Sequence, residues 1–335
     1  MDWTADVDAG SWLAARIDSP WRGTIHDVVP RGFDAYARVF HPASRDRPIG
    51  PAWPPLPYAA HRAEWEAFQA GNPQIDGEQV SWERTAAAFG TTMHPLAQWD
   101  ALVAPGVVVE NEDGPRDRVG WRYAQPELGQ LAPAVLAAVA GHLAQHTSTP
   151  DGGHLAVWEG WGGLVGGMAP MPSRAFLSVS DDARHRGLLA HLVPERFRSP
   201  FARDRWQPGI LPDDVSRGPR LRLPGRDHVL FTGGVAELAS PDWVLAAPWR
   251  DREAEAHGFE PSAHSPSLVW PTDRAWVLVS EVDWDSTVVA GSAALVADLC
   301  DDPALEAAPL SAGAALTEDS DTVNRAVPRP DSLPG

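Results

Sequence analysis

The stretch Ser265–Cys300, SPSLVWPTDRAWVLVSEVDWDSTVVAGSAALVADLC, is the clearest block of ordered structure in the sequence. Its part from Ala275 to Asp285 is rich in Val and Trp and contains neither Gly nor Pro, which is typical of a paired β-strand. Ser292 is a good helix N-cap, and apolar residues follow it at helical spacing before Pro303. The stretch therefore predicts a strand over 275–285 and a helix that begins after Ser292.

Three carboxylates fall on one face of this predicted strand. Side chains alternate along a strand, so Glu281, Asp283 and Asp285 share a face, with neighbouring Cα atoms about 6.7 Å apart. Like charges repel, and burying them without partners is costly. Three interpretations stay open: a strand end in solvent, a site for a cation or for acid–base work, and a network with arginines.

The composition excludes several classes of protein. The chain has 335 residues, enough for one large or two ordinary domains, and its 27 basic residues are all arginine. Without lysine there is no phosphate loop of the Walker type and no Schiff base with pyridoxal phosphate. The net charge of −18 argues against nucleic acid and against an anionic membrane surface.

Cysteine usage and hydropathy point to the cytoplasm. Cys300 is the single cysteine, so an internal disulfide is excluded. The first ten residues are acidic and lack an apolar segment, and the longest apolar run, 131–141, is too short to span a bilayer. We therefore expect a cytoplasmic protein with no membrane association.

The rest of the chain mixes short strands with helices. Strands are expected at Phe33–Phe40, Leu155–Trp158 and Ala175–Ser180 and in a hairpin over Leu221–Phe231, and helices at Tyr58–Ala70, Ser81–Phe89 and Leu128–His146. There is no regular βαβ alternation. We expect an α+β fold with a mixed or antiparallel sheet of short strands, helices packed on it, and long Pro-rich loops. Residues 1–311 are taken as one domain with a possible sub-boundary near 107–120, and residues 312–335 as a disordered tail.

Two further motifs carry chemistry-bearing side chains. The predicted strand Leu155–Trp158 runs into the glycine-rich segment EGWGGLVGG, which makes Trp158, Glu159 and Trp161 candidate ligand-binding residues. His142 and His146 lie four residues apart on one helical face, a spacing that zinc sites use. The HExxH signature of zinc proteases is absent, because Leu143 follows His142.

Two segments resemble an uncharacterised protein family of high-GC Gram-positive bacteria. They are SPSLVWPTDRAWVLVSEVDWDST in 265–287 and, more weakly, VPRGFDAYARVFHPA in 29–43. No activity is known for that family, so the resemblance implies no role for any residue.

No complete catalytic motif occurs in the sequence. The first hypothesis is therefore a non-enzymatic binding or protein-interaction module with a protein partner and no cofactor. Another hypothesis of binding without catalysis is that Trp158 and Trp161 bind a carbohydrate or an aromatic ligand.

The alternative to a binding module is a metal-assisted hydrolase that uses the carboxylate face. Glu281 and Asp283 would be catalytic, and Asp283 and Asp285 would bind a divalent cation. Arg274 would orient an anionic group of the substrate. A histidine, His41 or His154, would complete the site.

Overall fold

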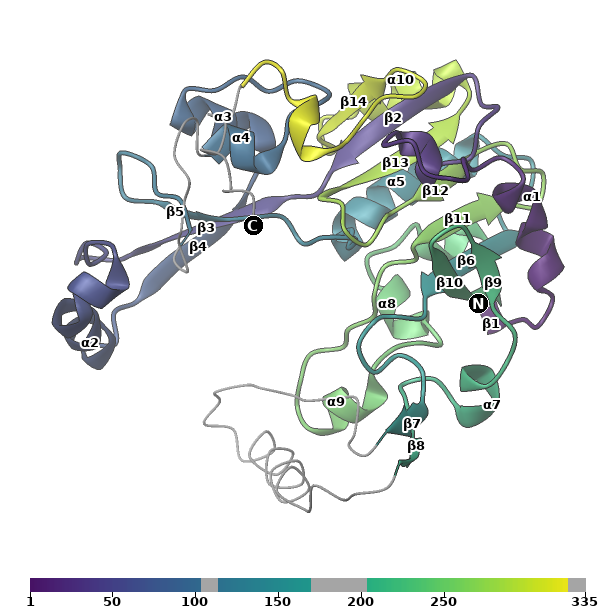
Figure 1. Ribbon diagram of the computed structural model, residues 1–335, viewed down its shortest axis with the longest axis horizontal. Helices are drawn as coiled ribbons and strands as arrows, with labels where there is room; N and C mark the ends of the chain where they lie inside the picture. Colours follow the sequence, from purple (N-terminus) through teal and green to yellow (C-terminus); the bar gives the residue numbers. More distant parts are fainter. Residues whose placement is uncertain (104–113, 170–203, 325–335) are drawn as a thin grey trace, which may run out of the picture.

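The computed structural model describes residues 1–103, 114–169 and 204–324, which form an α+β fold (Figure 1). Every strand pairing among them is antiparallel. The expected strand at Ala175–Ser180 and part of the expected sub-boundary near 107–120 lie outside the described residues. No helix among the described residues has both the length and the apolar character needed to cross a bilayer.

A main sheet of nine strands runs through the body of the molecule. Its spatial order is β1 (Asp2–Trp3), β10 (Arg226–Thr232), β6 (Gly153–Trp158), β11 (Leu268–Pro271), β12 (Val277–Val279), β13 (Ser286–Gly291), β2 (Ala35–Phe40) and β14 (Ala307–Leu310), with β9 (Leu221–Leu223) also paired to β10. The hairpin expected over Leu221–Phe231 is confirmed as β9 and β10, joined at Pro224–Gly225.

The described helices are mostly short. They are α1 (Ser11–Ala14), α2 (Arg62–Ala70), α3 (Trp82–Phe89), α4 (Trp99–Val103), α5 (Pro133–Gln145), α7 (Asp213–Ser216), α8 (Trp243–Ala246), α9 (Arg252–Ala256) and α10 (Ala293–Asp301). The predicted N-cap of the last of these helices is confirmed, and α3 ends at a glycine. Ser292 accepts a hydrogen bond from Leu295 N at the start of α10, and Gly90 ends α3 in the left-handed conformation at φ 73°.

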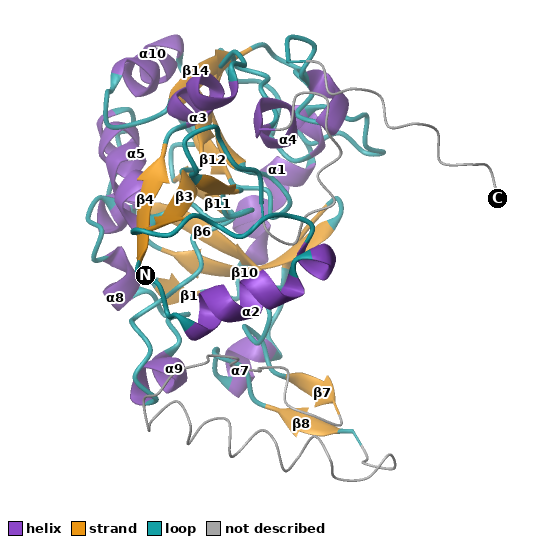
Figure 2. Ribbon diagram, turned by 90° about the vertical axis from the view of Figure 1, so that its left-hand side faces the viewer, coloured by secondary structure: helices purple, strands orange, loops and turns teal. Residues whose placement is uncertain are grey.

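Apolar residues cover both faces of the main sheet. On one face α5, α8 and α10 pack against alternate strand residues such as Val157, Phe231 and Val289. On the other face the N-terminal segment with α1 packs against the residues between them, such as Trp270 and Val288. The sheet is therefore the middle of three layers, with α5, α8 and α10 on one side and α1 on the other (Figure 2), as its alternating apolar side chains require.

The strand predicted over 275–285 is shorter than expected. It ends at Val279, and the chain then turns, with Trp284 N donating to the carbonyl oxygen of Glu281 at 2.9 Å. The following strand, β13, begins at Ser286 and pairs with β12. The carboxylates of Glu281 and Asp283 thus lie on a turn between two strands, and the prediction that the three carboxylates share one strand face is wrong.

An arm projects from the body of the molecule. We define the arm as residues 43–80 and 114–124, whose strands are β4 (Ile75–Val80), β3 (Ala43–Pro48) and β5 (Arg122–Ala124) in that spatial order. Strand β3 follows β2 directly along the chain, and α2 lies at the far end of the arm (Figure 1). Helices α3 and α4 pack at its base around Trp82 and Trp99.

The predicted disordered tail is ordered over its first part. Residues 312–324 are described, and Asp321 is buried against the loop before α4. Its carboxylate accepts hydrogen bonds from His94 Nε2 at 2.9 Å and from Gln98 N at 3.1 Å. These bonds satisfy a buried charge, so the expectation of disorder from residue 312 onward does not hold for 312–324.

Candidate functional site

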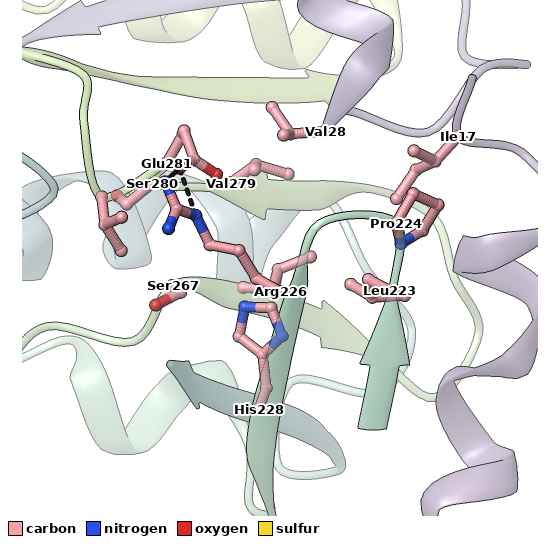
Figure 3. A pocket seen from close by; sticks show the side chains of 12 residues that line it. Ile17, Val28, Leu223, Pro224, Arg226, His228, Ser267, Val279, Ser280 and Glu281 are labelled. Atoms are coloured by element: carbon pink, nitrogen blue, oxygen red, sulfur yellow. Dashed lines mark hydrogen bonds and ion pairs between the residues drawn. The ribbon is translucent and has the colours of Figure 1, made fainter. Parts of the chain in front are cut away.

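Arg226, the first residue of β10, holds two of the predicted catalytic carboxylates. Its Nε donates to Glu281 Oε1 at 2.6 Å (Figure 3), and its Nη2 donates to Asp283 Oδ2. The side chain of Glu281 is only 11% exposed, whereas that of Asp283 is 76% exposed. The partner that offsets the buried charge of Glu281 is thus an arginine, as in the third interpretation of the sequence.

Asp285 belongs to a different ion pair. It accepts a 2.9 Å hydrogen bond from Nη2 of Arg38, whose side chain is 1% exposed. The other guanidinium nitrogens of Arg38 donate to Ser286 Oγ and to the carbonyl oxygens of Pro95 and Ala97. Every nitrogen of this buried charge has a partner, which is what a buried guanidinium requires.

The two predicted cation ligands therefore pair with different arginines, Asp283 with Arg226 and Asp285 with Arg38. Within 1–103, 114–169 and 204–324, no group of three or more His, Cys, Asp or Glu side chains has an arrangement suited to a metal ion. His142 on α5 instead contacts Asp302, which follows α10, and His146, which follows α5, contacts Asp298 on α10, each at 2.7 Å.

The predicted ligand-binding tryptophans lie beside the same arginine. The guanidinium of Arg226 stacks over Trp158, 4.9 Å from the ring centroid, and Trp161 meets Trp158 edge to face at 5.4 Å. The ring of Trp161 stacks on His264 at 4.4 Å. One face of each tryptophan ring is thus covered by another side chain of the protein.

Two other predicted site residues lie elsewhere. Glu159 forms an ion pair with Arg220 at 2.8 Å. Arg274, in a turn with φ 55°, places its guanidinium over Trp12 at 5.3 Å. The structure brings together Trp158, Glu281 and Asp283 around Arg226, and it leaves Glu159, Arg274 and Asp285 with other partners.

Sequence reasoning missed both organising arginines. Arg226 is separated from Glu281 by 55 positions, and Arg38 from Asp285 by 247. The available signal for Arg226 was its place at the start of the second strand of a predicted hairpin. Nothing in the sequence aligned that strand end with the turn that carries Glu281.

A small cavity of about 20 Å³, with mostly apolar walls and a few polar groups, adjoins Arg226. Ser267, Ser280 and His228 line it, and Figure 3 shows His228 and Ser267 beside the arginine. His228 is buried, and its Nδ1 has no hydrogen-bond partner among the described residues. A cavity of this size holds about one water molecule, so its chemistry suits a water-sized polar group.

The hydroxyl of Ser280 is oriented by a buried chain of hydrogen bonds. Burial lowers the pKa of His41 to about 4, so its ring is neutral at pH 7. Its Nδ1 donates to the carbonyl oxygen of Glu127, so Nε2 accepts from the Thr287 hydroxyl at 2.9 Å. Thr287 then has no second proton, and the Ser280 hydroxyl must donate to it at 2.5 Å.

The two histidines proposed to complete a carboxylate site therefore have other contacts. His41 ends the Ser280–Thr287 chain, and the ring of His154 stacks on Trp270 at 5.2 Å. Burial lowers the pKa of His154 as well. Because the Ser280 proton is donated to Thr287, the Ser280 oxygen can only accept hydrogen bonds on its cavity side. It therefore suits a bound hydrogen-bond donor, and no base is placed to activate it as a nucleophile among these contacts.

The arm carries a second and larger recess. An open groove of about 510 Å³ lies between the loop that follows β3 and the turn before β5. Arg47 and Asp76 lie on one side of it, Trp53 and Ile49 on the loop, and Val119 on the turn. The groove thus combines opposite charges with apolar and aromatic surface.

Arginine side chains stack on tryptophan rings in the arm beside the groove. The guanidinium of Arg47 lies 4.3 Å from the ring centroid of Trp121, and that of Arg122 lies 3.9 Å from the centroid of Trp53. Arg122 also donates to both carboxylate oxygens of Asp46. These contacts preorganise the groove with side chains that have little freedom left to lose on binding.

The arm also differs from the body in charge and in exposed apolar surface. It contains six arginines and six carboxylates, so its formal charge is zero in a chain of net charge −18. Of the large apolar side chains that are exposed among the described residues, four lie on the arm: Ile49, Tyr58, Ile75 and Val119. No protein-family model, curated protein or solved structure matches the chain.

Proposed function

We propose that this protein is a non-enzymatic binding module that holds a protein partner on its arm. The observation that carries the proposal is the neutral, partly apolar surface around the groove, on a projection from a strongly acidic chain. Exposed apolar side chains that lie close together are typical of protein-interaction surfaces. Because the arm carries no net charge, its own surface neither repels nor attracts a charged partner overall.

Two exposed side chains of the arm lie where a partner could cover them together. Ile49 is 58% exposed and Val119 is 74% exposed, and both line the groove. Ile75 does not line the groove, because its side chain lies on the opposite face of β4 from Asp76, which does. Burying such side chains supplies about 1.5–3 kcal/mol each, enough for two or three of them to dominate an interface.

A matched pair of substitutions tests the proposal. Site-specific photo-crosslinking from position 49 in the native cell identifies the partner, and position 245 serves as the crosslinking control. With the purified partner, Val119→Asp is expected to weaken binding at least tenfold, because it places a charge in a desolvated contact. Leu245→Asp changes an apolar residue on the body that is 48% exposed, and it is expected to leave binding unchanged. Equal affinities of the two variants would overturn the proposal.

The metal-assisted hydrolase with Glu281 and Asp283 remains the alternative. A divalent cation at these carboxylates would have to displace the guanidinium of Arg226. We therefore expect Mg²⁺, Mn²⁺, Ca²⁺ and Zn²⁺ to leave the melting temperature of chelator-treated protein unchanged. A cation bound only by the folded state would add about 2.7 kcal/mol at one hundred times its dissociation constant. A saturable rise that Asp283→Asn abolishes would favour the hydrolase. The cytoplasmic location likewise remains a prediction.

A further inference from the structure

Strand β4 forms an open edge of the arm. Within the described residues β4 pairs with β3 and with no other strand. The opposite edge of the same sheet, β5, is partly covered, because Tyr123 N donates to the carbonyl oxygen of Pro115 at 2.8 Å and Arg116 forms a bridge with Arg122. The two edges of this sheet are therefore not equivalent, and β4 is the one with no neighbouring strand among residues 1–103, 114–169 and 204–324.

Two other edge strands of the described residues carry features that discourage pairing. Strand β14 contains Pro309, which cannot donate a backbone hydrogen bond, and β1 has only two residues. Strand β4 has six residues, IDGEQV, and contains no proline. Its exposed edge thus has neither of these two features, and its charged side chains, Asp76 and Glu78, are acidic.

The register shows which backbone groups of β4 point outward. Antiparallel pairs alternate between hydrogen-bonded and non-hydrogen-bonded types. Ile49 N donates to Gln74 O at 2.8 Å, so the next pair, Pro48 with Ile75, is of the second type, as the missing N–H of proline requires. By alternation, the N–H and C=O groups of Ile75, Gly77 and Gln79 face away from β3.

Side chains beside this edge define the chemistry of a matching strand. Asp76 and Glu78 share one face of the sheet, and they are 46% and 40% exposed. Each already forms an ion pair with an arginine of β3, Asp76 with Arg47 and Glu78 with Arg45, so a basic residue on an added strand would be a second cationic neighbour. On the other face lie Ile75, which is 45% exposed, and Gly77, which has no side chain. Cross-strand neighbours of opposite charge attract and apolar neighbours pack, so a matching strand alternates basic and apolar residues.

We propose that β4 accepts an extended segment with alternating basic and apolar residues as an additional antiparallel strand. The inference rests on the proposed function, since it specifies how the arm would hold its partner. Strand addition of this kind derives its affinity from backbone hydrogen bonds and its specificity from alternate side chains. The net charge of −18 adds a long-range attraction toward a basic partner.

Gly77 offers a substitution that removes one outward N–H and leaves the pairing with β3 intact. Gly77→Pro deletes the central donor of the open edge and directs the proline ring toward an incoming strand. Gly77→Ala keeps the donor. An added Cβ would meet its nearest atoms, Arg45 O and Asp46 Cβ, at 3.9 Å, an ordinary contact, so this control is expected to fold normally.

The probe is a labelled peptide of alternating Arg and Val, and its binding is followed by fluorescence anisotropy. We expect it to bind the native protein and Gly77→Ala equally, and Gly77→Pro at least tenfold more weakly. The same peptide N-methylated at alternate residues keeps its charge but loses backbone donors, so it is expected to bind weakly as well. Circular dichroism verifies that both variants are folded.

Equal binding of the peptide to Gly77→Ala and Gly77→Pro, or no binding to the native protein, would overturn the strand addition. The natural partner then separates this inference from the proposed function. If Val119→Asp weakens the partner and Gly77→Pro does not, the arm is the binding surface but β4 does not accept a strand. If neither variant weakens it, both proposals fail.

Discussion

Replacing Asp285 with alanine is expected to lower the free energy of unfolding by about 3 kcal/mol. The substitution leaves the guanidinium of Arg38 buried, with a side chain only 1% exposed, and without its carboxylate. Breaking one side of a buried ion pair typically costs about 3–5 kcal/mol, because the remaining charge stays desolvated. We expect the lower end, since Asp285 is itself 16% exposed.

Asp283→Ala is the matched control, because it also removes a carboxylate from an arginine but on a side chain that is 76% exposed. Exposed ion pairs contribute about 0–1 kcal/mol. Urea denaturation of the two variants measures the difference. If the two variants lost similar amounts of unfolding free energy, the burial of Arg38 would not be the reason why Asp285→Ala destabilises the protein. The double variant Arg38→Met/Asp285→Ala is expected to recover part of the loss, since it removes the unpaired charge.

Acidification from pH 7 to pH 5 is expected to destabilise the protein by about 2 kcal/mol for each of two buried histidines. Burial, together with a nearby arginine, lowers the pKa of His41 and of His228 from 6.5 to about 4. The unfolded chain binds a proton at each histidine below pH 6.5, whereas the folded protein does not until about pH 4. Stability is therefore lost as the pH falls through this window, and the loss levels off below it.

His228→Gln tests this origin of the acid sensitivity. The variant has one histidine fewer to protonate on unfolding, so its stability is expected to fall by about 2 kcal/mol less than that of the native protein between pH 7 and pH 5. Urea denaturation at both pH values measures the change. Carboxylates with a lowered pKa, such as Asp302 beside His142, act mainly at lower pH. An unchanged pH dependence in the variant would contradict the assignment.

Local features of the fold were predictable where one residue determines the backbone. Ser292, Gly90 and the Pro224–Gly225 turn mark ends of elements through capping or backbone conformation, and the structure places elements there. The predicted strand over 275–285 is longer than the observed one, because EVDWDS alternates polar and apolar residues as a strand does. The signal that favoured a turn was its Asp and Ser content, since these residues bond to nearby backbone.

The candidate surfaces were less predictable because they depend on contacts between distant segments. Trp158, Glu281 and Asp283 were each selected from the sequence, but Arg226, which brings them together, was not. The arm was missed because the prolines between residues 43 and 57 are typical of the long Pro-rich loops that the sequence predicts. Its first part is strand β3, whose pairing with β4 and β5 no local pattern specifies.

The direct continuation of β2 into β3 determines how tension on the arm would spread through the protein. A pull along the arm enters the body through β2, which is bonded to β13 on one side and to β14 on the other. Because these hydrogen bonds run across the strand axis, such a pull shears many of them at once instead of opening them one by one. The arm is thus mechanically anchored in the main sheet, and a tethered partner could transmit force without peeling the arm away.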